Sequence, residues 1–491
     1  MQGLIIGDNF SDNPRTSIAR ANGAHRIASL LRKKNFQVEV IDFFNSWTID
    51  ELKLFVNKFN QLDFLGISIT LGKLDNYKVN VLIELVKQLN PNIKIIAGGS
   101  NVLLNKFNQV DLYFKGFADG AIDDLVKYLE TSNKDCFNVY EIKTHDIKNV
   151  INCTRDYGNY DLSNLKTEYT NNDFISNKET LTLETSRGCI FKCKFCSFPL
   201  TGKKKNDYIR TKEDIKSELV ENYKKWGVTK YLITDDTFND NLTKVESIYE
   251  ISKEIDFKLN FMCYARVDLL RANPKSLDML VNAGVRGMFF GIESVNEITG
   301  RHIGKKFTGD RLKNYLTFLK TKYPQLHLTG SFIVGLPFET AQMAKNNIVH
   351  LVDNKLLDAV TVYPLNIPIN NAINYISPFS NEWKNYGYTE LTDDELDLIN
   401  PNKPLTYLKK HYILWKNEFM NCFEAENYAN NIKNTVHDKI TMGGWNCFTG
   451  SFEHLTLDHY CNTLKVKLDW DYIKNSAFNY VNKYKINKLS I

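Results

Sequence analysis

The sequence predicts an α/β protein made of an N-terminal doubly wound domain, a partial (β/α)6 barrel and a helical C-terminal region. Short apolar runs rich in β-branched residues alternate with longer amphipathic segments through residues 1–130 and again through 181–370. This alternation is typical of parallel sheets covered by helices. From 371 to 491 it gives way to helical spacing. Since a single core stops growing at about 250–300 residues, a chain of 491 residues is expected to hold several domains.

Residues 1–130 are expected to form the doubly wound, Rossmann-like domain. The expected strands are Gly3–Ile6, Val38–Phe43, Phe64–Ile69 and Ile93–Ala97, and the expected helices include Ser17–Lys33 and Tyr77–Leu89. Ligands of such sheets bind at the carboxyl ends of the strands. Ser68, Thr70, Gly98 and Gly99 lie at that edge. On this evidence alone, ordinary strand ends explain them better than a binding site does.

Residues 131–180 are polar and rich in Asn, Asp, Ser and Thr, so we expect them to connect the two sheets. Residues 181–370 then contain six strand–helix units. The expected strands are Leu181–Thr185, Tyr231–Thr234, Asn260–Arg266, Gly287–Glu293, Leu328–Gly335 and Ala359–Pro364, and a capping box at Thr211–Asp214 opens an expected helix that ends at Trp226. Six units are fewer than the eight of a closed barrel, so an open barrel is expected, with its chemistry at the carboxyl ends of the strands.

The region 371–491 is expected to be mainly helical and carries no familiar motif. The expected helices are Leu391–Ile399, Leu405–Phe419 and Asp469–Tyr484. Cys422, Cys447 and Cys461 are spaced too irregularly for a metal knuckle. We expect them, like Cys263 on a barrel strand, to be buried thiols that pack as small hydrophobes.

Three cysteines carry the strongest chemical information. Cys189, Cys193 and Cys196 have the spacing CxxxCxxC in the loop after the first barrel strand. Thiolates are soft donors that suit iron–sulfur clusters, zinc or copper(I). Three of them can hold three corners of a four-iron, four-sulfur cluster and leave the fourth iron open. Structural zinc needs four ligands, usually from two knuckles, and the sequence has no second knuckle.

Further polar residues follow the next barrel strands at the same end. They are Asp235 and Asp236 after the second strand, Arg266 on the third, Glu293 and Ser294 on the fourth, and Gly335 after the fifth. Taken singly, each has an ordinary explanation, such as an ion pair or a helix cap. Their placement at successive strand ends behind the cysteine loop favours one shared site.

The cysteine run, with the aromatic Phe195 directly before its last cysteine, resembles the signature of the radical S-adenosylmethionine (radical SAM) enzymes. The segments Tyr231–Phe238, Tyr264–Asp268, Gly291–Ser294 and Phe332–Pro337 are similar to the cobalamin-associated and methylthiotransferase-like branches of that superfamily. The resemblance covers residues 181 to about 368.

The resemblance implies a 4Fe-4S cluster on the three cysteines, with S-adenosylmethionine bound beside it. Asp235 and Asp236 lie where the family contacts the S-adenosylmethionine amino group, and Arg266, Glu293 and Ser294 lie where it contacts the ribose or the methionine carboxylate. Phe195 and Gly335 belong to the same cofactor surface. A one-electron reductant such as flavodoxin or ferredoxin is also implied.

The N-terminal domain resembles the cobalamin-binding module that often precedes this core. The module has the signature DxHxxG, then SxL, then GG. Only Ser68-Ile69-Thr70 and Gly98-Gly99 stand where the last two parts would be. The histidine motif is missing, and His25, inside an expected helix, is better explained as an ordinary helix residue. Cobalamin is therefore left open by the sequence.

The activity implied is reductive cleavage of S-adenosylmethionine to a 5′-deoxyadenosyl radical that abstracts hydrogen. With cobalamin, the leading outcome is methyl transfer to an unactivated carbon; without it, rearrangement, oxidation or sulfur insertion stay open. An RNA-modifying methylthiotransferase ranks lower, because Cys136 and Cys153 are the only cysteines upstream of the loop. A non-catalytic zinc-loop scaffold or nucleic-acid-binding protein is the alternative outside enzymes. Whether the substrate is a small molecule or a peptide is not encoded in any visible motif.

Composition limits the partners and the compartment. Hydrophobic residues make up 43% and aromatic residues 12% of the chain, enough for packed cores. A net charge of only +5 does not indicate nucleic acid. No apolar run reaches 18 residues, so no membrane span is expected. The N-terminus reads as a first strand and not as a signal peptide, and a cytoplasmic enzyme is the default expectation.

Overall fold

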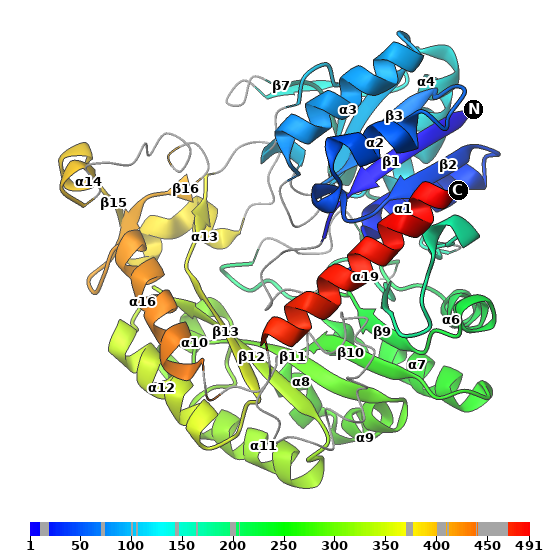
Figure 1. The fold of residues 1–491 in the computed structure, drawn as a ribbon. Helices are drawn as coiled ribbons and strands as arrows, with labels where there is room; N and C mark the ends of the chain where they lie inside the picture. The colour runs from blue at the N-terminus through cyan, green and yellow to red at the C-terminus, as the bar shows by residue number, and fades with distance from the viewer. Residues whose placement is uncertain are drawn as a thin grey trace.

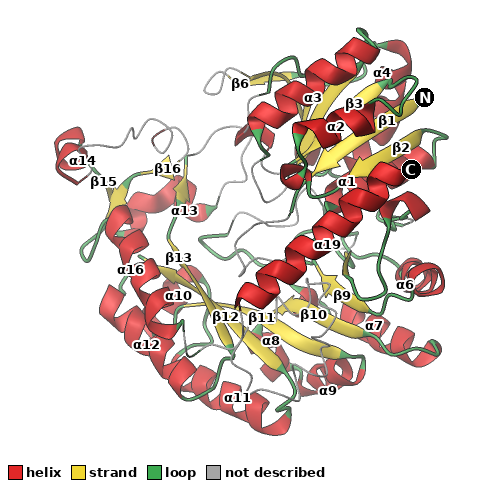
Figure 2. Cartoon of the chain, viewed as in Figure 1, coloured by secondary structure: helices red, strands yellow, loops and turns green. Residues whose placement is uncertain are grey.

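The computed structural model contains two parallel sheets, followed by a helical region whose last helix returns to the first sheet (Figures 1 and 2). It describes all residues except 10–18, 70–73, 100–101, 105–106, 143–146, 164, 197–202, 206, 370–376, 400–408, 410–411, 438 and 440–469, and the side chains of 470–474 and 476. Thr70, Cys447 and Cys461 lie outside the described residues.

The N-terminal sheet has the strand order β2-β1-β3-β4-β5-β7-β6 and is parallel except for the β6–β7 pair. Its strands are β1 (Gln2–Gly7), β2 (Gln37–Ile41), β3 (Phe64–Ser68), β4 (Lys94–Gly99), β5 (Leu112–Lys115), β6 (Tyr140–Ile142) and β7 (Ile147–Asn152). Its helices are α1 (Asn22–Arg32), α2 (Ile49–Val56), α3 (Asn76–Leu89), α4 (Ile122–Thr131) and the short α5 (Cys153–Asp156). Separate apolar cores fill its two faces, which confirms the doubly wound class.

The segment expected as a plain connection, residues 131–180, differs in its first half. Strands β6 and β7 complete the N-terminal sheet, and β7 pairs in parallel with β5. Ile147, Val150 and Ile151 are buried there. These few apolar residues, with Ile142 on β6, lie in a polar run, which is too weak a pattern for a strand to be recognised in the sequence.

The second sheet is an open, six-stranded parallel sheet in the order β13-β12-β11-β10-β9-β8. Its strands are β8 (Thr180–Leu183), β9 (Lys230–Ile233), β10 (Asn260–Ala265), β11 (Val285–Glu293), β12 (His327–Val334) and β13 (Ala359–Pro364). Its helices are α6 (Lys212–Trp226), α7 (Leu242–Glu254), α8 (Val267–Ala272), α9 (Pro274–Asn282), α10 (Glu297–Ile303), α11 (Gly309–Lys322) and α12 (Ala341–Asp353). The partial barrel is confirmed, and Thr211 caps α6 by accepting a hydrogen bond from the Asp214 backbone N–H.

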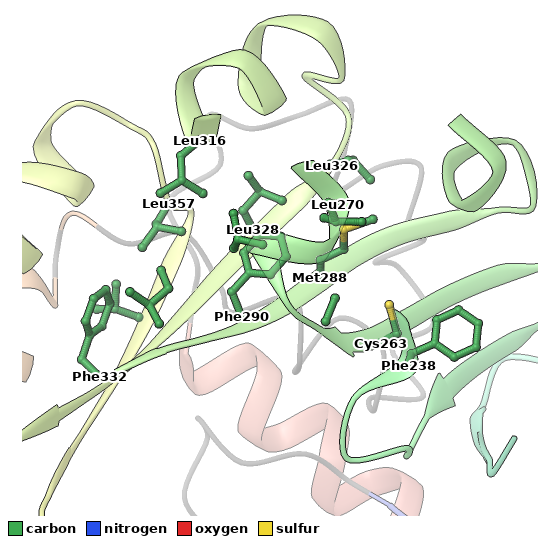
Figure 3. Close-up of a cluster of buried hydrophobic side chains, with 14 of the residues drawn as sticks. Phe238, Cys263, Leu270, Met288, Phe290, Leu316, Leu326, Leu328, Phe332 and Leu357 are labelled. Atoms are coloured by element: carbon green, nitrogen blue, oxygen red, sulfur yellow. The ribbon is translucent and has the colours of Figure 1, made fainter. Parts of the chain in front are cut away.

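A continuous apolar core joins this sheet to its helices (Figure 3). Phe290 and Leu328 on neighbouring strands pack with Leu316 from α11. Cys263 lies in the same cluster and is fully buried. It therefore packs as a small hydrophobe on its strand, as expected from the sequence.

The C-terminal region is helical with two small two-stranded sheets. Its helices are α13 (Pro378–Glu382), α14 (Asp393–Ile399), α16 (Cys422–Val436) and α19 (Trp470–Ser490), and its strands are β14 (Ile367–Pro368), β15 (Thr389–Glu390), β16 (Tyr412–Ile413) and β17 (Trp415–Lys416). The helix expected over Leu405–Phe419 is wrong where the chain is described, because β16 and β17 lie there. Burial of Trp415 against the barrel has overridden the local helical pattern.

The helix α19 packs on the N-terminal domain, beside α2 and the end of β2 (Figure 1). Ala477, Val481 and Tyr484 join the core of that domain. The rings of Tyr484 and Phe43 meet edge to face, with 5.3 Å between centroids. The N-terminal core is thus completed by the last helix of the chain. No helix among the described residues is both long and apolar enough to cross a membrane.

Candidate functional site

The three cysteines lie on one loop at the carboxyl end of β8. Cys189 and Cys193 are buried and Cys196 is half-buried. The loop turns at Gly188, whose φ of +82° is a conformation that favours glycine. The backbone N–H of Cys196 donates to the carbonyl of Cys193 at 3.1 Å, and that of Lys194 donates to Ile303 at 3.2 Å. The loop is therefore fastened to the end of α10.

Asp235 holds the base of this loop in place. One carboxylate oxygen accepts the backbone N–H groups of Thr185 (2.8 Å) and Ser186 (3.1 Å). The other accepts their hydroxyl groups at 2.5 and 2.7 Å. Asp235 is almost completely buried, at 1% exposure. A buried carboxylate with this many donors is a structural anchor, since its lone pairs are satisfied within the protein.

A buried lysine behind Asp235 extends this anchor. Lys244 on α7 donates to the Ser186 hydroxyl and to the Thr237 carbonyl, both at 2.8 Å, and lies 2.6 Å from Asp240. The hydroxyl of Thr237 in turn lies 3.4 Å from Sγ of Cys189. Lys244 thus ties the cysteine loop to the loop after β9. Its only mark in the sequence is the four-residue spacing from Asp240, which is common on exposed helices.

Asp236 differs from its neighbour although both were expected to act together. Its side chain is exposed, whereas Asp235 is buried. Desolvation by the surrounding protein and the charge of Asp235 raise the pKa of Asp236 to about 7. Of the two carboxylates, Asp236 is the one open to a ligand.

Arg266, at the end of β10, reaches the cysteine loop. Its Nη1 atom lies 3.5 Å from Sγ of Cys193, and its guanidinium stacks over the Phe191 ring at 4.1 Å. Asp268 accepts two further hydrogen bonds from it, at 3.0 and 2.7 Å. These contacts place Arg266 beside the thiol of Cys193.

Glu293 and Ser294 occupy a distorted strand end. The register of β11 on β12 shifts between Gly291 and Glu293, and Glu293 has φ of +67°, a strained value for a non-glycine residue. Burial raises the pKa of Glu293, while the charges of Lys305 and Arg266 oppose that rise. This buried carboxylate therefore faces the same region as Arg266.

The hydroxyl of Ser294 donates to Glu339 at 2.8 Å. Glu339 is buried, and burial raises its pKa to about 7. Sequence reasoning did not single out Glu339, because one carboxylate after a glycine-proline turn is unremarkable as a pattern. Ser294 is thus bound to a second carboxylate that the strand-end pattern did not include.

Phe195 and Gly335 have packing roles in the structure. Phe195 packs against the barrel core. Gly335 has φ of +96°, and a Cβ there would lie 2.5 Å from the Trp415 ring. Its carbonyl accepts a hydrogen bond from the Tyr388 hydroxyl at 2.8 Å. The C-terminal region therefore covers the sheet edge at this glycine.

In the N-terminal domain, Ser68 and Gly98 are paired at the carboxyl edge of the sheet. A Cβ on Gly98 would meet only Phe114, at an ordinary 3.6 Å. Gly99 has φ of +120°, and a Cβ there would lie 2.1 Å from the Ile69 carbonyl, so close backbone packing explains this glycine. Small residues line the edge, and Thr70 lies outside the described residues.

His25 is a core residue, as expected from its place in a helix. It is fully buried, and its Nε2 lies 2.8 Å from Asp42. Its ring also packs against Tyr169, with 4.8 Å between centroids. These contacts engage Nε2 and the ring of His25 in the packing of the domain.

The two sheets meet directly beside the cysteine loop. Arg187, two residues before Cys189, pairs with Asp119 of the N-terminal domain at 2.8 Å and with Glu184 at 2.6 Å. Its guanidinium also stacks over Phe117 at 3.9 Å. The carboxyl ends of both sheets therefore face a common region.

The three thiols are a donor set that a 4Fe-4S cluster can use. In the described part of the chain, no three His, Cys, Asp or Glu side chains gather closely enough to enclose one metal ion. A four-iron cluster takes each thiolate on a different iron atom, so its ligands need not converge on one point. Three cysteines on one loop satisfy that requirement.

Comparison with known proteins agrees with this geometry. Residues 183–348 match the model of the radical SAM superfamily. An uncharacterised methyltransferase of Pyrococcus horikoshii is 24% identical over 351 residues, which cover 66% of this chain and 72% of the relative.

Two solved structures share the architecture. The radical S-adenosylmethionine methyltransferase TsrM from Kitasatospora setae, with cobalamin and a 4Fe-4S cluster bound, has a TM-score of 0.64 and 12% identity, with 99% of each chain covered. The cobalamin-dependent S-adenosylmethionine radical enzyme OxsB, with aqua-cobalamin and S-adenosylmethionine bound, has a TM-score of 0.54 and 17% identity, covering 99% of this chain and 71% of OxsB.

The superfamily match shows that residues 183–348 are a radical SAM domain, and the fold and the cysteine loop agree with it. Radical SAM enzymes use a 4Fe-4S cluster together with S-adenosylmethionine. The superfamily match favours an enzyme over the non-catalytic zinc scaffold considered from the sequence.

Proposed function

We propose that this enzyme cleaves S-adenosylmethionine reductively at a 4Fe-4S cluster held by Cys189, Cys193 and Cys196, and that it transfers a methyl group to an unactivated carbon with cobalamin in its N-terminal domain. The observation that carries the proposal is the cysteine loop at the point where the two sheets meet, fixed there by the Arg187–Asp119 pair. When bound, the cluster would supply one electron for the cleavage of S-adenosylmethionine to a 5′-deoxyadenosyl radical, and cobalamin would carry the methyl group.

The residues of the chain would bind and orient the reactants. Asp236 is proposed to accept a hydrogen bond from the S-adenosylmethionine amino group, because the oxygens of Asp235 already serve Thr185 and Ser186. Glu293 and Ser294 are proposed to face the ribose or the methionine carboxylate. Both are buried at the end of β11, which is paired with the strand that precedes Arg266, and water would be excluded there from the reacting atoms.

The proposed cobalamin site is the sheet edge at Ser68, Gly98 and Gly99. Its support is the small size of these residues, the ordinary 3.6 Å contact that a Cβ at Gly98 would make, and the shared fold with two proteins solved with cobalamin. Because His25 is engaged with Asp42, we propose that it does not serve as the lower cobalt ligand. A protein reductant of the flavodoxin or ferredoxin kind would supply the electron.

Replacing Cys189, Cys193 or Cys196 with Ala tests the first half of the proposal. After anaerobic reconstitution the wild type should hold about four irons and four sulfides per chain and should form 5′-deoxyadenosine under a reductant. Each variant should lose both while keeping its circular dichroism spectrum, because the barrel has its own apolar core.

Matched controls are Cys263→Ala, in the barrel core, and Cys422→Ala, half-buried on α16. Both should keep full iron content. Full cleavage activity in any single variant of the loop would show that the ligand assignment is wrong. One zinc per wild-type chain, without iron, would overturn the proposed function as a whole.

A further inference from the structure

Arg266 is held rigidly with its charge against the sulfur of Cys193. Its backbone exchanges two hydrogen bonds with the side chain of Asn239, at 2.8 and 2.9 Å. Its guanidinium donates hydrogen bonds to both carboxylate oxygens of Asp268 and stacks over the ring of Phe191. The residue is only 8% exposed. Its orientation is therefore set before any ligand arrives.

Two of these contacts belong to the cysteine loop itself. Phe191 lies between Cys189 and Cys193 in sequence, and Cys193 receives the Nη1 hydrogen bond at 3.5 Å. A guanidinium that donates to a thiolate makes a charge-assisted hydrogen bond, stronger than a neutral one. Hydrogen bonds and positive charge at the sulfur ligands are among the main determinants of a cluster's reduction potential.

We propose that Arg266 is a positioning residue for the thiolate of Cys193 and raises the reduction potential of the cluster. The inference rests on the proposed function, since it requires the cluster. It departs from the role that the family resemblance implies for Arg266, which is contact with the ribose or carboxylate of S-adenosylmethionine. The positive charge stabilises the reduced cluster, which carries one more electron than the oxidised form.

The test is the midpoint potential of the reconstituted protein without S-adenosylmethionine, followed by electron paramagnetic resonance. Arg266→Gln should hold wild-type iron and sulfide but have a more negative midpoint potential. The matched control is Arg271→Gln, which removes the same charge from α8 at an exposed position over Phe307. Its potential should equal that of the wild type.

The outcomes separate the inference from the function on which it rests. A wild type without a cluster overturns the proposed function before any variant is compared. An unchanged potential in Arg266→Gln, with weaker S-adenosylmethionine binding, overturns the inference alone and returns Arg266 to substrate contact.

If Arg266→Gln does not fold by circular dichroism, Arg266→Met carries the test. Methionine removes the charge and keeps an unbranched side chain that can pack against Phe191. A more negative potential in this variant supports the inference, and a wild-type potential overturns it.

Discussion

At the scale of single residues, the adjacent carboxylates Asp235 and Asp236 differ in their burial. Asp235 is buried among Thr185, Ser186 and Lys244, and Asp236 is exposed beside it. Both residues follow the end of β9 at Ile233, and the loop there directs Asp235 to the base of the cysteine loop while Asp236 stays exposed. A motif of two aspartates therefore supplies one anchor and one group open to a ligand.

This division predicts a pH dependence that only Asp236 controls. Desolvation first and then the charges of Asp235 and Asp240 raise its pKa, against Lys244 and Arg187, to about 7. Below pH 7 the carboxyl is protonated and above it is charged, so its help to a bound amino group should grow from pH 6 to pH 8. The measurement is the Kd for S-adenosylmethionine on reconstituted protein.

In Asp236→Asn this contribution should vanish at every pH. The Kd of the variant divided by the Kd of the wild type should therefore rise with pH. Asp235→Asn serves as the comparison. It should instead lower the free energy of unfolding by about 2–3 kcal/mol, since hydrogen bonds to a buried charge are lost. A pH-independent ratio for Asp236→Asn would contradict the assignment.

The sequence identified the cysteine loop because the chemistry depends on local spacing. It did not identify Lys244, Asp268 or Glu339 as partners of the site. Each of these lies on a helix or turn where a charged residue is normally solvated. These residues belong to the site because they are close to it in the fold, and a local sequence pattern does not reveal such long-range contacts. Arg266 was identified, but its contact with Cys193 could not be foreseen.

At the scale of elements, the six strands of the second sheet and strands β1 to β4 of the N-terminal sheet could be predicted because they are rich in buried apolar residues, whereas β5, β6 and β7 were not predicted. The predicted Ala359–Pro364 agrees with β13 residue for residue. The helix over Leu405–Phe419 failed because Trp415 is held by the barrel, where its indole N–H donates to the Leu365 carbonyl at 3.0 Å. Strand β7 was missed because its burial depends on pairing with β5. In both cases tertiary contact overrides local preference.

The carboxyl end of β4 allows a test of the proposed cobalamin site. Gly98→Trp should place a bulky side chain beside Ser68 and abolish the binding of hydroxocobalamin, which is followed by its visible spectrum. The matched control is Gly98→Ala, whose added Cβ would meet only Phe114, at an ordinary 3.6 Å, and which should therefore keep binding. Binding that persists in Gly98→Trp would place the ligand elsewhere.

At the scale of the whole molecule, one buried ionic cluster joins distant parts of the chain. Arg20 pairs with Asp42 at 2.9 Å and with Glu179 at 2.8 Å, and it donates to the hydroxyl of Tyr480 on α19. The charges of His25 and Arg20 hold the pKa of Asp42 well below its usual range. The N-terminal sheet, the connecting segment and the last helix thus share one site of attachment.

Removing Arg20 should release the last helix. Arg20→Gln leaves Asp42 and Glu179 buried without their main counter-charge, a loss of about 3–5 kcal/mol for a broken buried ion pair. Hydrogen exchange should accelerate across 477–488 and remain unchanged in β11 and β12. In contrast, Lys34→Gln removes an exposed pair with Asp123 and should have little effect. Unchanged exchange in α19 would show that its apolar contacts suffice.

The return of α19 to the N-terminal domain also has a consequence for how the protein is made. Arg20 and Tyr480 are 460 positions apart. The last strand of the N-terminal sheet ends at Asn152 and Tyr484 follows 332 positions later, so at about 5–20 residues per second the domain waits about 17–66 seconds for the helix that completes its core. During that interval Phe43 lacks its contact with Tyr484, and Arg20 lacks its contact with Tyr480. The nascent chain therefore passes through a period of exposed apolar surface, in which chaperone binding would be most useful.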